Sequence, residues 1–196
     1  MNRYDWMLVI FTAVLVWSGI APKDYPTWAL EVSPAVIGAV LLVATRKRFQ
    51  FSDFAYWVML AHAVVLMVGG HYTYAEVPLF DWLREPMGWS RNNYDKVGHF
   101  MQGFSPAVIA LEILWRNQVV KSRGWLVFLT ICVCMAVSAV YELIEWLVAV
   151  LSQEAADAFL GTQGYEWDTQ SDMLWCLIGA CTMMLLQGFG GGLRRR

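Results

Sequence analysis

Three short motifs of ionisable residues stand at or near the ends of apolar stretches of the chain. The motifs are Asp95-Lys96-x-x-His99, Glu142-x-x-Glu145 and Asp168-x-x-x-Asp172. Ionisable groups are costly at membrane depth, so by default they mark a functional site. Carboxylates and imidazole are also the side chains that bind divalent metals and transfer protons in catalysis.

The spacing of the motifs places their side chains at one level of the membrane. Within each motif the ionisable residues are three or four apart, so they would share one face of a helix. In a helix that starts at Gly124, Glu142 lies about 27 Å and Glu145 about 31 Å along the axis. The hydrocarbon core of a bilayer is about 30 Å thick. The two glutamates therefore reach the membrane boundary at which the helices of the other two motifs begin.

A cluster of carboxylates at this depth needs positive charge, because its members cannot all ionise side by side. Arg91 and Lys96 are the nearby cations, and they are too few for the acids. A divalent metal would balance the charge, and helical bundles build metal sites from acidic and His side chains on facing helices. Oxygen-rich ligation with one imidazole suits Mn, Zn, Fe or Mg rather than copper. The candidate ligands are Asp95, His99, Glu142, Asp168 and Asp172.

A purely structural interpretation stays open beside the metal site. Asp95 and Asp168 are suited to cap helices, because Asp at an N-cap accepts a hydrogen bond from a free backbone N–H group. Lys96 would then pair with Glu145. Capping does not explain Glu142 and Glu145, because negative charge is disfavoured near the C-terminal end of a helix.

Composition and hydropathy predict a membrane protein. Of 196 residues, 58% are hydrophobic and 15% are charged, against roughly 45–50% and about 25% in soluble domains. Six apolar spans approach or reach the ~17–25 residues of a membrane helix. They cover about 6–21, 27–45, 54–70, 97–115, 124–151 and 171–189. Because lipid cannot satisfy open backbone groups, we expect an all-α, polytopic six-helix transmembrane bundle that forms a single domain over residues 1–196.

The distribution of basic residues predicts the orientation. With the N-terminus in the cytoplasm, ten of the fourteen Lys and Arg residues fall on the inner side, as the positive-inside rule requires. We therefore expect a multi-pass protein with both termini cytoplasmic, surrounded by membrane lipids and without a nucleic-acid partner. The sequence leaves the oligomeric state open. In the first long outer loop, residues 77–84 combine Trp, Leu and Phe with charge, which predicts a short helix at the membrane interface.

Several segments between residues 71 and 179 carry a family resemblance. They are HYTYAEVP at 71–78, YDKVGHF at 94–100, YELIEW at 141–146, GTQG at 161–164 and WDTQSDM at 167–173. Through them the chain resembles the YjdF-type bacterial inner-membrane proteins, a family of unassigned activity. The resemblance implies a location in the bacterial inner (plasma) membrane.

A looser similarity is to the VanZ-like membrane proteins, which are linked to glycopeptide-antibiotic tolerance. The residues that follow their pattern are Asp95, Lys96, His99, Glu142, Asp172 and Gly179. Glu145 stands where the pattern usually has Gln, and Cys176 stands where it has Asn. This similarity implies a common helical scaffold more firmly than a common function.

Three functions remain open, and the sequence does not decide whether the chain is an enzyme. The first is a metal-dependent hydrolase or transferase that acts on a lipid or envelope precursor, with a metal that activates water. Glu145 or His71 would then be the base, and Lys96 or Arg91 would hold a lipid-like or anionic substrate. The second is a proton- or ion-coupled transporter, because intramembrane acids mark ion pathways. The third is a non-catalytic accessory membrane protein.

Overall fold

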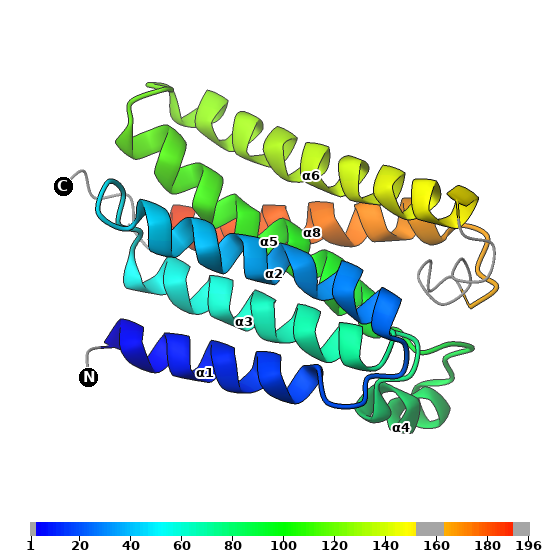
Figure 1. Ribbon diagram of the computed structural model, residues 1–196. Helices are drawn as coiled ribbons and strands as arrows, with labels where there is room; N and C mark the ends of the chain where they lie inside the picture. The colour runs from blue at the N-terminus through cyan, green and yellow to red at the C-terminus, as the bar shows by residue number, and fades with distance from the viewer. Residues whose placement is uncertain (1–2, 152–162, 190–196) are drawn as a thin grey trace. The chain divides into compact units, whose positions relative to one another are not determined.

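A computed structural model describes residues 3–151 and 163–189 of the chain. Within these ranges the chain forms seven helices and no strand (Figure 1). The helices are α1 (Arg3–Ser18), α2 (Tyr25–Thr45), α3 (Asp53–His71), α4 (Pro78–Met87), α5 (Tyr94–Arg116), α6 (Arg123–Leu151) and α8 (Asp168–Phe189). The all-α class predicted from the sequence is confirmed for this part of the chain.

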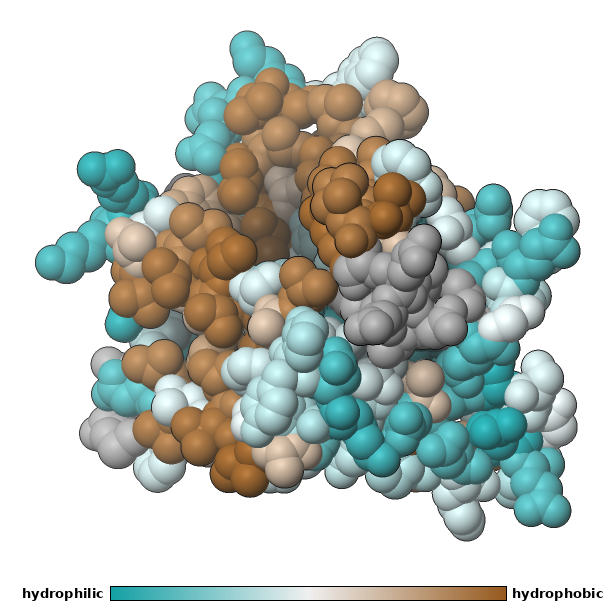
Figure 2. Space-filling model, turned by 45° about the vertical axis from the view of Figure 1, so that its right-hand side comes forward, coloured by the Kyte–Doolittle hydropathy of each residue, from teal (hydrophilic) through white to brown (hydrophobic). Residues whose placement is uncertain are grey.

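Five of these helices, α2, α3, α5, α6 and α8, are long and apolar enough to cross a membrane. The helix α1 has 16 residues, just below the ~17–25 that a spanning helix needs. A sixth span therefore stays a prediction. Broad hydrophobic areas, drawn in brown, cover much of the face shown in Figure 2. Exposed apolar side chains of α2 and α6 include Ile37, Val40, Val140 and Leu143, as expected of helices that meet lipid.

The chain divides into two compact units. The first unit contains residues 1–98 and 144–166, and the second contains residues 99–143 and 167–196. The helices α5 and α6 contribute residues to both units. The single transmembrane domain expected from the sequence stays a prediction.

In the first unit, α3 packs against both α1 and α2 (Figure 1). The buried side chains between these helices are Val32, Ala35, Ala63 and Met67. Capping residues fix where two of the helices begin, because the first N–H groups of a helix have no partner within it. The Asp24 carboxylate accepts from Thr27 N–H at 2.7 Å at the start of α2, and the Ser52 hydroxyl accepts from Ala55 N–H at 3.1 Å at the start of α3.

The short helix α4 also belongs to the first unit. It ends at Gly88, which takes the left-handed conformation (φ 65°) that glycine adopts without steric cost. Phe80 packs against the rings of Trp89 and Tyr94, with ring centroids 6.1 and 5.3 Å apart. The exposed apolar side chains are Leu79, Trp82 and Met87. A helix is therefore present where the sequence predicts one, and its place at the membrane interface stays a prediction.

In the second unit, two glycines allow α5 and α8 to approach each other closely. A Cβ atom on Gly103 would overlap the backbone carbonyl of Cys176, and one on Gly179 would overlap that of Phe100. The Cys134 thiol of α6 donates to the Gly103 carbonyl at 3.4 Å, and the Cys176 thiol donates to the Cys134 carbonyl at 3.6 Å. Small residues at such contacts are typical of membrane helix pairs. The close approach of α5, α6 and α8 positions the site.

Candidate metal centre

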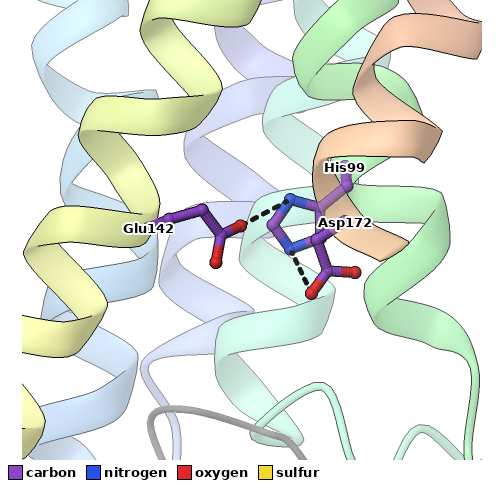
Figure 3. A group of neighbouring side chains, drawn as sticks. All are labelled: His99, Glu142 and Asp172. Carbon is purple, nitrogen blue, oxygen red and sulfur yellow. Dashed lines mark ion pairs between the residues drawn. The ribbon is translucent and has the colours of Figure 1, made fainter. Parts of the chain in front are cut away.

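One imidazole and two carboxylates meet within the second unit (Figure 3). His99 comes from α5, Glu142 from α6 and Asp172 from α8. The His99 Nδ1 atom lies 3.8 Å from Glu142 Oε1, and its Nε2 atom lies 3.6 Å from Asp172 Oδ2. All three residues are more than nine-tenths buried. Each ring nitrogen of His99 therefore faces one acid.

The local sequence explains why these side chains meet. His99 precedes Gly103 by one helical turn, and Asp172 precedes Gly179 by about two turns. Because the two glycines bring the backbones of α5 and α8 together, the side chains just before them lie across a narrow gap. The His99 ring also lies 3.3 Å, from Nδ1 to Oε1, from the Gln102 side chain, and the Tyr141 ring lies at its edge.

The geometry of the cluster fits a metal ion. One ligand atom from each of His99, Glu142 and Asp172 lies within 4.8 Å of the others. Ligand atoms ~2.0–2.2 Å from a tetrahedral metal lie about 3.4 Å apart. Either ring nitrogen of His99 has one carboxylate oxygen near that separation, at 3.8 Å for Nδ1 and at 3.6 Å for Nε2. Two carboxylates and a neutral imidazole would offset the charge of a divalent cation. Most proteins orient a metal-bound His through a hydrogen bond to its other ring nitrogen, and Gln102 is placed for contact with that ring.

Asp168 is a further candidate ligand of the second unit. It lies one helical turn before Asp172 on α8 and is 5% exposed. A carboxylate oxygen of Asp168 lies within 4.8 Å of a carboxylate oxygen of Asp172. The structure thus brings Asp168 beside one of the three central side chains, as the spacing of four residues predicts.

Asp95 and Lys96, which the sequence places in the same motif as His99, belong to the first unit. The Asp95 carboxylate accepts a hydrogen bond from the Arg91 guanidinium, and its Oδ2 atom lies 3.3 Å from Lys96 Nζ. Arg91 and Lys96 also lie beside the Tyr165 ring, 5.6 and 5.8 Å from its centroid. Two cations therefore already accompany Asp95 within its own unit.

The segment that carries Tyr165 is held by paired hydrogen bonds. The Gln163 side chain accepts from the Asn92 backbone N–H at 3.0 Å and donates to the Asn92 backbone carbonyl at 2.9 Å. Asn92 is itself fully buried, and its side chain donates to the Val77 carbonyl and to Asp81. These contacts fix the basic side chains and Tyr165 as one local arrangement in the first unit.

His71, predicted as a base, lies at the end of α3 in the first unit. Its ring stacks on Trp17 with centroids 4.7 Å apart, and its Nδ1 atom lies 2.9 Å from the Ser18 carbonyl. Its backbone carbonyl accepts from Lys23 N–H at 3.0 Å. These contacts join the end of α3 to the end of α1 and the start of α2. The catalytic role of His71 stays a prediction.

Glu145, the other predicted base, is also buried in the first unit, at 8% exposure. Its catalytic role stays a prediction.

The sequence analysis missed two residues of the first unit. Glu31 is 5% exposed on α2, and the Tyr74 hydroxyl oxygen is buried near it. The signal for Glu31 was present in the sequence, since it is the single acid within the apolar span 27–45. Tyr74 gave no comparable signal.

The described residues define a helical membrane protein with a buried cluster of one His and two carboxylates in its second unit. The chain belongs to the family of predicted membrane proteins DUF2238, which it matches over residues 4–190. It is 49% identical over 174 residues to the inner membrane protein YjdF of Escherichia coli (strain K12), which covers 89% of this chain and 83% of that protein. None of the solved structures matches the chain. The resemblance to the YjdF-type proteins is confirmed, and the similarity to VanZ-like proteins stays a prediction.

Proposed function

We propose that this chain is an inner-membrane metalloprotein in which His99, Glu142 and Asp172 bind a divalent cation. The observation that supports this proposal most directly is the His99 imidazole between two buried carboxylates from two other helices. Burying a carboxylate is expensive unless a positive charge compensates for it. A divalent cation would compensate for two carboxylates at once, and it would use the imidazole as a neutral ligand. Asp168, one helical turn before Asp172, is a further candidate ligand.

The donor set selects a class of metals. Three nitrogen and oxygen donors without a thiolate suit Mn, Zn, Fe or Mg. Catalytic metal sites typically keep a position for water beside about three protein ligands. In that position the metal would activate water for attack on a phosphoester or amide. We therefore propose a metal-dependent hydrolase or transferase that acts on a lipid or envelope precursor.

The catalytic roles predicted from the sequence belong to the same proposal. They are a general base, Glu145 or His71, and a cation that holds an anionic group of the substrate, Lys96 or Arg91. In the membrane, α1 is a sixth span, α4 lies in the interface, and both termini are cytoplasmic. Support for this topology comes from the excess of Lys and Arg on one side and from the exposed apolar residues Leu79, Trp82 and Met87 of α4.

The test of the proposed function is metal analysis of the purified protein after loading with Mn, Zn, Fe or Mg. We expect one of these metals to remain bound to the wild-type protein and to be lost from His99→Ala, Glu142→Gln and Asp172→Asn. Glu112→Gln is the matched control, because Glu112 forms an ion pair with Arg116 at 3.1 Å on the same helix as His99. The hydrolase is then tested by adding the metal-loaded protein to vesicles that contain an anionic phospholipid and measuring the headgroup that is released. A monodisperse wild-type protein that retains none of the four metals would contradict the proposal.

A proton- or ion-coupled carrier is the second candidate. It is favoured by Thr130 and Ser138, which lie twelve and four residues before Glu142 on α6. Both are fully buried, and neither hydroxyl has a hydrogen-bond partner of normal geometry among the described residues. Together with Glu142 they form a polar stripe along one helix face. Proton flux into proteoliposomes that stops in Glu142→Gln, but continues in Glu112→Gln, would favour the carrier over the hydrolase.

A further inference from the structure

Glu31 is a buried acid within an apolar helix of the first unit. It lies on α2, one of the helices apolar enough to span a membrane, and is 5% exposed. Gly70 of α3 lies directly beside it, since a Cβ atom on Gly70 would be 3.2 Å from Glu31 Cβ. An ionisable side chain in such a position is expensive to keep charged, and such residues usually have a function.

The backbone after α3 turns the Tyr74 side chain into the first unit. Thr73 and Tyr74 both adopt left-handed conformations, with φ of 54° and 56°, which is unfavourable for residues with a side chain. The Tyr74 ring fills the space beside Gly69 and Gly98, where any added Cβ atom would collide with it. Two glycines and two strained residues thus serve to bury one ring. Strain of this kind concentrates at functional sites.

Buried hydroxyl groups near Glu31 could form hydrogen bonds to a protonated carboxyl group. Thr27 lies one helical turn before Glu31 and is 1% exposed. The hydroxyl oxygens of Thr27 and Tyr74 are buried and have no hydrogen-bond partner of normal geometry among the described residues. Burial raises the pKa of Tyr74 well above its usual value, and the charges of Glu31, Tyr94 and Glu145 raise that pKa further. Tyr74 therefore keeps its proton and can donate it in a hydrogen bond.

We propose that Glu31, Tyr74 and Thr27 form a buried proton-binding site in which the Glu31 carboxyl group holds a proton at neutral pH. The carboxylate takes this proton from water and returns it to water on release, so no other reactant is needed. The neutral acid accepts a hydrogen bond from the Tyr74 hydroxyl and donates its own proton to Thr27 Oγ1. The charges of Tyr94 and Glu145 also act on Tyr74. This site shares no residue with the cluster of His99, Glu142 and Asp172.

Infrared difference spectroscopy of the full-length protein in lipid vesicles tests this proposal. At neutral pH, the spectrum of the wild type minus that of Glu31→Gln is expected to contain the C=O stretching band of a protonated carboxylic acid. In Tyr74→Phe the same band is expected to move to higher frequency, because the acid loses a hydrogen bond. Glu76→Gln is the matched control and should not change the band, since Glu76 is exposed and pairs with Lys23 at 2.8 Å.

Two results would overturn the proton site. One is a wild-type minus Glu31→Gln spectrum that contains only carboxylate bands at neutral pH. The other is an acid band that disappears when sodium replaces choline in the buffer, which would indicate a site for a metal cation. If Glu31→Gln fails to fold, the spectrum of the wild type minus that of Tyr74→Phe still decides, because the absence of a shifted acid band from it would overturn the site.

Discussion

Replacing Gly103 by alanine is expected to destabilise the second unit strongly. The added methyl group would overlap the backbone carbonyl of Cys176, and backbone cannot move aside as a flexible side chain can. Separating α5 from α8 would also break the thiol hydrogen bonds of Cys134 and Cys176. We expect a loss of about 3 kcal/mol or more in unfolding free energy. Thermal unfolding of the protein in a mild detergent measures this loss.

Other glycines in the chain provide controls for this prediction. Gly179→Ala should be equally harmful, because its methyl group would overlap the Phe100 carbonyl. Gly38 lies inside α2 and Gly188 lies on α8, and nothing surrounds either position within 4 Å. Alanine at these two positions should leave stability unchanged or raise it by up to about 1 kcal/mol, because alanine favours the helix. Equal melting temperatures for Gly103→Ala and Gly38→Ala would show that α5 and α8 do not pack through Gly103.

Substitution of the three central side chains is expected to have the second largest effect, on metal affinity. Asp172→Asn and Glu142→Gln keep the size of the side chain and remove its charge, so they should fold. Changing a residue that only supports a ligand already weakens metal binding about 10- to 100-fold. We therefore expect a loss of at least about 100-fold for each of these variants and for His99→Ala, measured by calorimetric titration with Mn or Zn.

The same titration has an expected dependence on pH. Metal ligands must be deprotonated to bind, so affinity should fall when the pH is lowered. Glu112→Gln should bind with the affinity and pH dependence of the wild type. Glu112 pairs with Arg116 at 3.1 Å on the same helix, and this ion pair involves none of the three central residues. Affinities of His99→Ala, Glu142→Gln and Asp172→Asn within about threefold of the wild type would exclude these side chains as ligands. Even a change to a supporting residue weakens metal binding by about 10- to 100-fold.

Hydropathy located the helices well but placed some of their ends wrongly. The spans expected at 54–70 and 124–151 correspond closely to α3 (Asp53–His71) and α6 (Arg123–Leu151). The helices α5 and α8 begin three residues before the predicted 97 and 171. Their first turns contain polar residues such as Asp95 and Asp168, which lower the mean hydropathy and therefore fall outside the predicted spans. Helix formation depends on backbone hydrogen bonds and capping, which hydropathy does not measure.

Helix geometry predicted part of the candidate site. Rise per residue and helical phase placed His99, Glu142 and Asp172 at one depth, and the structure brings these three together. Asp95 meets Arg91 and Lys96 in the first unit, and its role as a metal ligand stays a prediction. These pairings are local, because Arg91 lies four residues before Asp95 and Lys96 directly after it, whereas the meeting of His99, Glu142 and Asp172 depends on which helix faces touch.

Close backbone approach was the second feature hidden from the sequence. Gly103 and Gly179 lie in apolar spans where glycine has many roles, and only the packing of α5 on α8 shows why a side chain is excluded there. The inward turn of Tyr74 depends on two left-handed residues that are not glycine, a conformation that sequence patterns do not indicate. Glu31 was visible as a lone acid, and its importance became clear only from the buried hydroxyls of Tyr74 and Thr27.

X-ray absorption at the edge of the bound metal tests most directly whether His99, Glu142 and Asp172 form a metal centre. The predicted spectrum shows a first shell of oxygen and nitrogen at about 2.0–2.2 Å, with the outer-shell scattering of a single imidazole and no sulfur. In His99→Ala the imidazole scattering should disappear, and in Glu112→Gln it should remain. A first shell that contains sulfur, or an imidazole signal that persists in His99→Ala, would contradict the proposed centre.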